Sequence, residues 1–313
     1  MMSLSRAALR IALCVGPLGA LAGCGDWVEY DPEARPGSGG EPAAPTQVDE
    51  AFAKLYEGAT RLDHVLFESV LGRYVVEQGQ ATYVDYDGLA ASAEGSFLLS
   101  QYVASVDLVD PTLLESHEEK LAYWINAYNA LVLSGVLEIY GGDAGYSVSD
   151  DLFAFFSKRG FRAAGRVLSL DELEHVIIRG DTEHASALGL TEAERTDLLS
   201  LHADLWGDRP LDPRIHVAVN CASLGCPDLG RAAFRADALE DQLAAATARF
   251  LANPEKGAGP DGISSLFDWF AQDFSAGDYE GAEDFIQRWR GEGLDDVDTG
   301  RFLSYDWSLN IAP

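Results

Sequence analysis

The chain has 313 residues, of which 51 are acidic and 22 basic, so its formal net charge is −29 at pH 7. This charge argues against a nucleic-acid partner, because phosphate backbones require a basic surface, and it also argues against a polybasic patch for anionic lipid. The sequence is 47% hydrophobic and 10% aromatic, which is sufficient for a folded core. The composition therefore argues against nucleic acid and anionic lipid as partners, but it does not indicate an activity.

Residues 1–23 have the pattern of an export signal. Residues 11–22 are apolar or small, but this stretch is too short to span a bilayer as a helix. Leu21-Ala22-Gly23-Cys24 resembles a bacterial lipobox, in which the cysteine receives a lipid and becomes the first mature residue. The alternative is an ordinary secretory signal followed by an unmodified cysteine. Gly25 follows in place of aspartate, which by the same resemblance favours the outer membrane.

We therefore expect a protein of the cell envelope that is anchored by a lipid at Cys24, on the periplasmic face of the outer membrane. Residues 24–48 are rich in proline, glycine, alanine and acid, which predicts a flexible tether. Residues 49–313 show no second linker of this kind and no internal repeat, which indicates a single globular domain. No other stretch is long and apolar enough to span a membrane.

The globular part reads as mainly helical. Apolar spacing predicts helices, in chain order, over residues 51–74, 117–140, 170–178, 236–251, 267–273 and 280–289. Short strands are expected over residues 83–86, 166–168, 214–220 and 262–266. Gly141-Gly142 should end the second helix, and Ser169-Leu170-Asp171-Glu172 matches a capping box that should begin the third. This mixture predicts an α+β fold, a single mainly helical domain with a few short strands.

Two amides lie three residues apart in the predicted helix over residues 117–140. This helix is apolar almost all round, which predicts that it is buried. Buried amides need hydrogen-bond partners, since each unsatisfied group costs about 1–3 kcal/mol. Asn126 and Asn129 therefore either hold neighbouring loops or line a site, where one of them could bind a substrate or an imidazole.

The predicted helix over residues 170–178 contains a Glu-His pair. His175 and Arg179 are four residues apart and should share a face. Glu174 and His175 could form an acid/base pair or bind a metal, or the three side chains could form a structural network of ion pairs and hydrogen bonds. A single Glu-His pair does not define a metal site, and we expect none.

Residues 216–227 contain the largest concentration of chemically reactive side chains in the sequence. In the expected strand, His216 and Asn220 alternate onto one face, just before a turn that contains Cys221 and Cys226. The other two cysteines lie in the predicted signal and at the lipid site, so these two have only one another as partners.

Outside the cytoplasm, paired thiols are usually oxidised, which favours a structural disulfide between Cys221 and Cys226. The alternative is a reactive thiol with His216 or His175 as its base. Zinc is disfavoured, because the sequence offers no second Cys/His pair of matching spacing.

Together, five motifs resemble the domain-of-unknown-function 547 family over about residues 83–310. They are Trp-Ile-Asn-Ala-Tyr-Asn-Ala-Leu (124–131), Leu-Asp-Glu-Leu-Glu-His (170–175), Asp-Pro-Arg-Ile-His (212–216), Asn-Cys-Ala-Ser-Leu-Gly-Cys-Pro (220–227) and Tyr-Asp-Trp-Ser-Leu-Asn (305–310). The family occurs in exported bacterial proteins, and in plants beside a leucine-zipper segment, without a settled activity. This chain departs from the family pattern at Pro227-Asp228, where a second proline is expected.

Two functional hypotheses follow. We favour a binding or assembly module of the envelope, held by a Cys221–Cys226 disulfide, with an envelope ligand or protein as its partner and no cofactor. The alternative is a thiol hydrolase or acyl-transferase, which resembles the Cys-His-Asn arrangement of papain-like and transglutaminase-like folds in residue types alone. In that hypothesis the catalytic residues are Cys221, Cys226, His216, His175, Glu174 and Asn126, and the substrate-binding residues are Asn129, Asn220 and Arg179.

Overall fold

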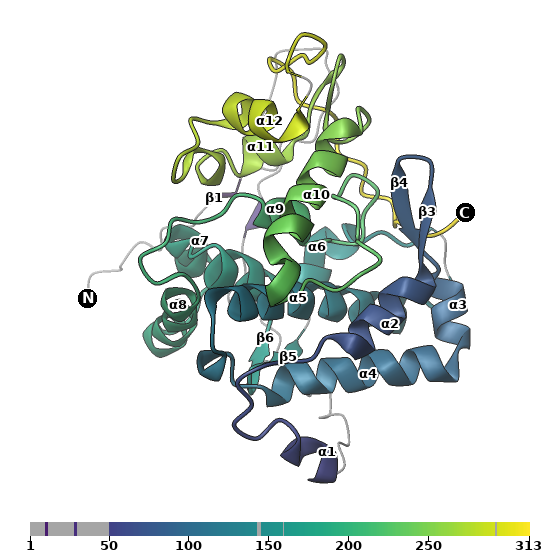
Figure 1. Ribbon diagram of the computed structural model, residues 1–313, viewed down its shortest axis with the longest axis vertical. Coiled ribbons are helices and arrows are strands. Elements are labelled where there is room, and N and C mark those ends of the chain that lie inside the picture. Colours follow the sequence, from purple (N-terminus) through teal and green to yellow (C-terminus); the bar gives the residue numbers. More distant parts are fainter. Residues whose placement is uncertain (1–9, 12–27, 30–49, 143–144, 159, 292) are drawn as a thin grey trace, which may run out of the picture.

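The computed structural model describes residues 10–11, 28–29, 50–142, 145–158, 160–291 and 293–313 (Figure 1). The lipobox with Cys24, and nearly all of the expected signal and tether, lie outside these residues. In the described ranges, no helix has both the length and the apolar character that a membrane span requires.

Helices make up most of the described chain. The α-helices are α1 (Glu50–Lys54), α2 (Val65–Tyr74), α3 (Tyr86–Ala91), α4 (Ala93–Leu108), α5 (His117–Tyr140), α6 (Asp150–Ser157), α7 (Thr182–Ala187), α8 (Glu192–Trp206), α9 (Ile215–Ala218), α10 (Leu239–Ala252), α11 (Leu266–Trp269) and α12 (Ala282–Arg290). Short 3₁₀ turns form η1 (Pro111–Leu113), η3 (Ala236–Ala238) and η4 (Asp273–Ser275), and η2 (Glu172–Ile178) is a π-helix.

The strands pair locally as small antiparallel ribbons. The pairs are β1 (Arg10–Ile11) with β2 (Val28–Glu29), β3 (Val75–Gln78) with β4 (Ala81–Val84), β5 (Phe161–Ala163) with β6 (Arg166–Leu168), and β7 (Ala258–Gly259) with β8 (Gly262–Ile263). The predicted mainly helical α+β fold is therefore confirmed.

Helix α5 runs across the centre of the molecule, with α4 alongside it and α11 and α12 towards one end (Figure 1). The side chain of Ser116 caps its start by accepting the N–H of Glu119, and Gly141 ends it with a left-handed φ of 53°. Every residue from 121 to 133 is buried. The predicted bounds and burial of this helix are both confirmed.

Two predicted elements are wrong. Residues 51–74 do not form one helix, because Gly58 has a left-handed φ of 68° and Asp63 accepts the N–H of Val65, which starts α2 anew. Residues 214–220 do not form a strand. The side chain of Asp212 accepts the N–H of Arg214 at 2.9 Å, and this local bond starts the single turn of α9.

The buried apolar side chains form two clusters. The larger surrounds α5, α4, η2 and α8, and the smaller joins α10, α11 and α12 through Phe250, Phe267, Phe274 and Phe285. Helix α9 lies between them, because Ile215 and Ala218 belong to the larger cluster and Val217 to the smaller. Polar residues on α9 therefore lie at the boundary of two cores.

The C-terminal segment, residues 302–312, contacts several distant parts of the fold. Its isolated bridges join Phe302 to Ile263, Ser308 to Ser147, Leu309 to Ser223 and Ile311 to Val84. The C-terminal segment is therefore docked on the body of the domain by backbone bridges.

A buried histidine outside the five sequence motifs should make the stability of the fold depend on pH. His64 accepts or donates a 2.7 Å hydrogen bond with the Tyr102 hydroxyl through Nδ1, and its Nε2 is buried without a partner. Burial lowers the pKa of His64 from 6.5 to about 4. The folded state thus keeps the ring neutral, whereas the unfolded chain takes up a proton as the pH falls below 6.5.

The stabilisation is therefore complete above pH 6.5 and decreases as the pH falls towards 4. Between pH 7 and pH 5 the loss should be about 2 kcal/mol. Urea unfolding of the parent protein and of His64→Phe at both pH values measures it, because the variant shares every other titrating group. Equal pH dependence in the two proteins would exclude a role for this imidazole.

Candidate functional site

Two neighbouring groups of polar side chains form the candidate site. The ionic cluster consists of Asp171, His175, Arg179, His184, His216 and Asp273, and the thiol group consists of Cys221, Ser223, Cys226 and Tyr305. The residues of each group come from parts of the chain that are far apart in the sequence.

Helix η2 supplies one face of the ionic cluster. Its predicted capping box is confirmed, since Ser169 and Glu172 exchange backbone-to-side-chain hydrogen bonds of 2.7 and 3.1 Å. The turn is wider than in an α-helix, because the N–H of Arg179 donates to the carbonyl of Glu174, five residues earlier. Such π-helical turns are frequent at functional sites.

Asp273 joins an arginine and a histidine of the cluster. Its Oδ2 accepts hydrogen bonds from Arg179 Nε at 2.6 Å and from His216 Nε2 at 2.8 Å. The side chains of His216 and Arg179 are only 1% and 9% exposed. Although burial opposes the ionisation of Asp273, the hydrogen bonds from His216 and Arg179 outweigh it and lower the pKa of this carboxyl.

Phe270 closes this part of the cluster from the side of the smaller core. The His216 ring stacks on it with centroids 4.1 Å apart and planes at 16°, and the Arg179 guanidinium lies 4.6 Å from the same ring centroid. The aromatic face thereby keeps the ion pair away from water on one side and adds a cation–π contact.

The other end of the cluster contains two neutral imidazoles. Burial lowers the pKa of His175 well below its ordinary value and lowers that of His184. Their ring centroids are 4.2 Å apart, and Arg179 Nη1 lies 2.8 Å from His175 Nδ1. Burial, with Glu174 and Glu172 nearby, raises the pKa of Asp171 to about 7.

In the thiol group, the sulfur atoms of Cys221 and Cys226 are 2.9 Å apart. This is contact without a covalent bond, which would be about 2.05 Å long. Cys221 Sγ also lies 3.2 Å from Ser223 Oγ and from the Tyr305 hydroxyl. Among the described residues, no hydrogen bond joins either sulfur to an imidazole, so the cysteines and histidines form separate groups.

The two thiols differ in acidity. Burial alone would raise the pKa of Cys221, but hydrogen bonds with Cys226, Ser223 and Tyr305 outweigh it and lower this pKa to about 7. Burial and the neighbouring Cys221 raise the pKa of Cys226 well above its ordinary value. Cys221 is therefore the group that ionises first.

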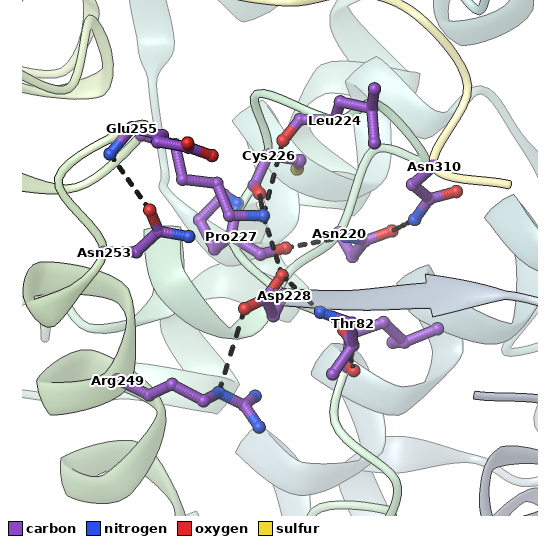
Figure 2. Close-up of polar contacts among 12 residues, drawn as sticks. Thr82, Asn220, Leu224, Cys226, Pro227, Asp228, Arg249, Asn253, Glu255 and Asn310 are labelled. Atoms are coloured by element: carbon purple, nitrogen blue, oxygen red, sulfur yellow. Dashed lines mark hydrogen bonds and ion pairs between the residues drawn. The ribbon is translucent and has the colours of Figure 1, made fainter. Parts of the chain in front are cut away.

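Asn220 shapes the loop that presents the thiols. Its Nδ2 donates to the Pro227 carbonyl at 2.7 Å (Figure 2). Its Oδ1 accepts the N–H of Ala222, which has a left-handed φ of 64°. Asn310 donates to the same Oδ1 at 3.3 Å. Asn220 is thus a positioning residue for the loop, since it bonds both ends of the loop and the distant Asn310.

Asp228, at the position where the resemblance leads us to expect a second proline, has a structural role. Its carboxylate accepts the N–H of Thr82 at 3.1 Å and a hydrogen bond from Lys256 Nζ at 2.7 Å, and it lies 4.0 Å from Arg249 Nε (Figure 2). Lys256 Nζ also donates to the carbonyl of Cys226 at 2.9 Å. Asp228 therefore ties the thiol loop to β4 and α10.

The two amides of α5 hold backbone segments. Asn126 exchanges hydrogen bonds of 2.7 and 3.0 Å with the carbonyl and N–H of Phe234. Asn129 donates to the Ala218 carbonyl at 2.9 Å and accepts the N–H of Asn220 at 2.8 Å. This arrangement corresponds to the first alternative for these amides, in which they pin neighbouring loops.

Electrostatic interactions of Tyr128 and Glu174 link the two groups. Burial raises the pKa of the Tyr128 hydroxyl well above its ordinary value, and charges on Glu174 and Cys221 add to this effect. Burial lowers the pKa of His216, although Asp273 and Glu174 partly offset this effect by favouring the protonated ring. The buried tyrosine is thus close enough to Glu174 and to the thiol group to interact with both electrostatically.

A pocket of about 550 Å³ opens beside the thiol group. It is lined by Gly145, Tyr146, Ser147 and residues 304–308. Tyr305 belongs to both the pocket and the thiol group, and its ring packs 4.4 Å from Trp307 and 4.9 Å from Trp269. The pocket therefore offers aromatic surface together with hydroxyl and carboxylate groups.

Residues 112–251 match the model of a family described as "Protein of unknown function, DUF547". The match includes four of the five motifs and supports the resemblance seen in the sequence, while the motif over residues 305–310 lies beyond it. Neither the curated proteins nor the solved structures include a match to the chain.

Proposed function

We propose that this protein is an exported, lipid-anchored module of the cell envelope that binds a ligand or another envelope protein, and that a Cys221–Cys226 disulfide stabilises its binding loop. The observation that supports this most is the 2.9 Å separation of the two sulfurs in a loop with no imidazole bonded to either. Oxidation needs only a small approach of the two sulfurs, and it is favoured in an exported protein.

The pocket next to this loop is the proposed binding surface. Its volume of about 550 Å³ lies in the range of ordinary small-ligand sites. The aromatic rings of Tyr305 and Trp307 would provide contact area, and Ser304, Asp306 and Ser308 would provide hydrogen bonds. A disulfide would fix the loop that positions Tyr305, and so the shape of the pocket.

The thiol state of the exported protein tests this proposal. Trypsin should release residues 215–231, which contain both cysteines, as one peptide. Without reductant, we expect this peptide to lack alkylation and to weigh two hydrogen atoms less than the dithiol form in mass spectrometry. After reduction, both cysteines should be alkylated. Cys24 is the internal control, since a lipidated thiol is alkylated under neither condition.

Quantitative alkylation of Cys221 without reductant would instead support the second candidate, a thiol hydrolase or acyl-transferase. The observation in its favour is the lowered pKa of Cys221, about 7, in a half-buried position beside the pocket. In that case the rate of alkylation should rise through about pH 7, as the thiolate forms.

A further inference from the structure

We propose that Asp171, His175 and His184 form a binding site for one divalent transition-metal ion of the Zn²⁺ class. One donor atom from each residue lies within 4.8 Å of a donor atom of the other two. Asp171 Oδ1 and His175 Nε2 are 4.0 Å apart. His184 Nε2 is buried and has no hydrogen-bond partner in the described structure, so a metal bond would satisfy it.

The distances suit closure around a small ion. A tetrahedral Zn²⁺ with bonds of about 2.0–2.1 Å holds its donor atoms about 3.4 Å apart. Each of the three side chains would therefore move by less than about 1 Å to reach this geometry. Two imidazoles and one carboxylate match the donor types of known three-residue zinc sites, which leave a fourth position open for water or a ligand oxygen.

The short connection between η2 and α7 brings the two histidines together. The N–H of Asp181 donates to the carbonyl of His175 at 2.8 Å, and the Asp181 carboxylate accepts the N–H of His184 at 2.8 Å. Gly180 makes the turn with a left-handed φ of 69°, and a Cβ there would collide with the His202 ring. Local backbone bonds thus place both rings before any ion binds.

Arg179 determines how His175 would bind the ion. A guanidinium only donates, so the 2.8 Å contact makes His175 Nδ1 the acceptor and leaves the ring proton on Nε2. Metal binding through Nε2 requires this proton to move to Nδ1, with loss of the Arg179 hydrogen bond. Arg179 keeps its contacts with Asp273 at 2.6 Å and Asp181 at 3.4 Å, so its charge stays compensated.

Titration of the detergent-solubilised full-length protein, made without an affinity tag, with Zn²⁺ alone tests the site. Isothermal calorimetry should show one ion bound per chain. His184→Ala and Asp171→Asn should each weaken the affinity at least about tenfold, since even outer-shell partners of a metal contribute this much. Co²⁺ in place of Zn²⁺ should give visible absorption bands that disappear in the same variants.

Two controls separate this site from other donors. His117→Ala removes a histidine outside the cluster, whose Nδ1 bonds the Leu205 carbonyl, and should leave the affinity unchanged. The double variant Cys221→Ser/Cys226→Ser should also bind Zn²⁺ normally, whatever the thiol test shows. The proposal is overturned if no ion binds stoichiometrically, if His184→Ala and Asp171→Asn bind as the parent does, or if the double variant loses binding.

Discussion

Replacing Asp273 with asparagine should lower the free energy of unfolding by about 3 kcal/mol. The carboxylate compensates the charge of Arg179 and accepts a hydrogen bond from His216, and these two side chains are 9% and 1% exposed. Asparagine keeps the shape but loses the negative charge, so the compensating carboxylate left beside the buried guanidinium is the more distant Asp181, at 3.4 Å. Removing one partner of a buried pair is costly because the other charge stays desolvated.

Urea unfolding at pH 7 measures the effect of Asp273→Asn. The matched control is Asp268→Asn, an exposed aspartate on α11 in the preceding turn of the same segment, which should change stability by less than about 0.5 kcal/mol. If the two variants are equally stable, the ion pair across the boundary of the two cores contributes nothing to holding them together.

The second large effect is expected for Asn126→Leu, which should cost about 3 kcal/mol. The side chain is 1% exposed and satisfies both the N–H and the carbonyl of Phe234, itself only 9% exposed. Leucine fits the apolar surroundings of α5 but leaves two buried backbone groups unpaired, each worth about 1–3 kcal/mol. The gain from burying an apolar side chain offsets only part of this loss.

Thermal and urea unfolding of Asn126→Leu give the measurement. Gln287→Leu makes a similar amide-to-leucine change at an exposed position of α12 and should be nearly neutral. An Asn126→Leu protein as stable as the control would show that the Phe234 backbone finds other partners.

Sequence patterns predicted correctly those helices whose ends are set by neighbouring residues. The bounds of α5 follow from its apolar spacing with a serine cap and a terminal glycine, and the capping box of Ser169 and Glu172 forms as expected. The strand expected over residues 214–220 failed because its polar alternation is equally compatible with one helical turn, which Asp212 initiates through the N–H of Arg214.

The candidate site was less predictable, because its decisive contacts are distant in sequence. Asp273 lies 57 residues from His216 and 94 from Arg179, and no spacing rule links them. His184 lies outside the motifs, and only the turn at Gly180 brings it to His175. Tyr305 was within a motif, but its hydroxyl reaches Cys221 across 84 residues. The residue types were visible in the sequence, whereas their grouping depended on tertiary structure.

The C-terminal segment also has a consequence for the order of folding. Asn310 accepts a hydrogen bond from the Tyr86 hydroxyl, 224 residues earlier, and Val84 bonds the backbone of Asn310 and Ala312. Contacts over such separations form slowly, because the loop entropy is lost before the bonds are gained. Since residues 302–312 are synthesised after all their partners, the ribosome must finish them before the domain can close. The bonds of Val84 and Tyr86 with this segment are therefore among the last that a newly made chain can form.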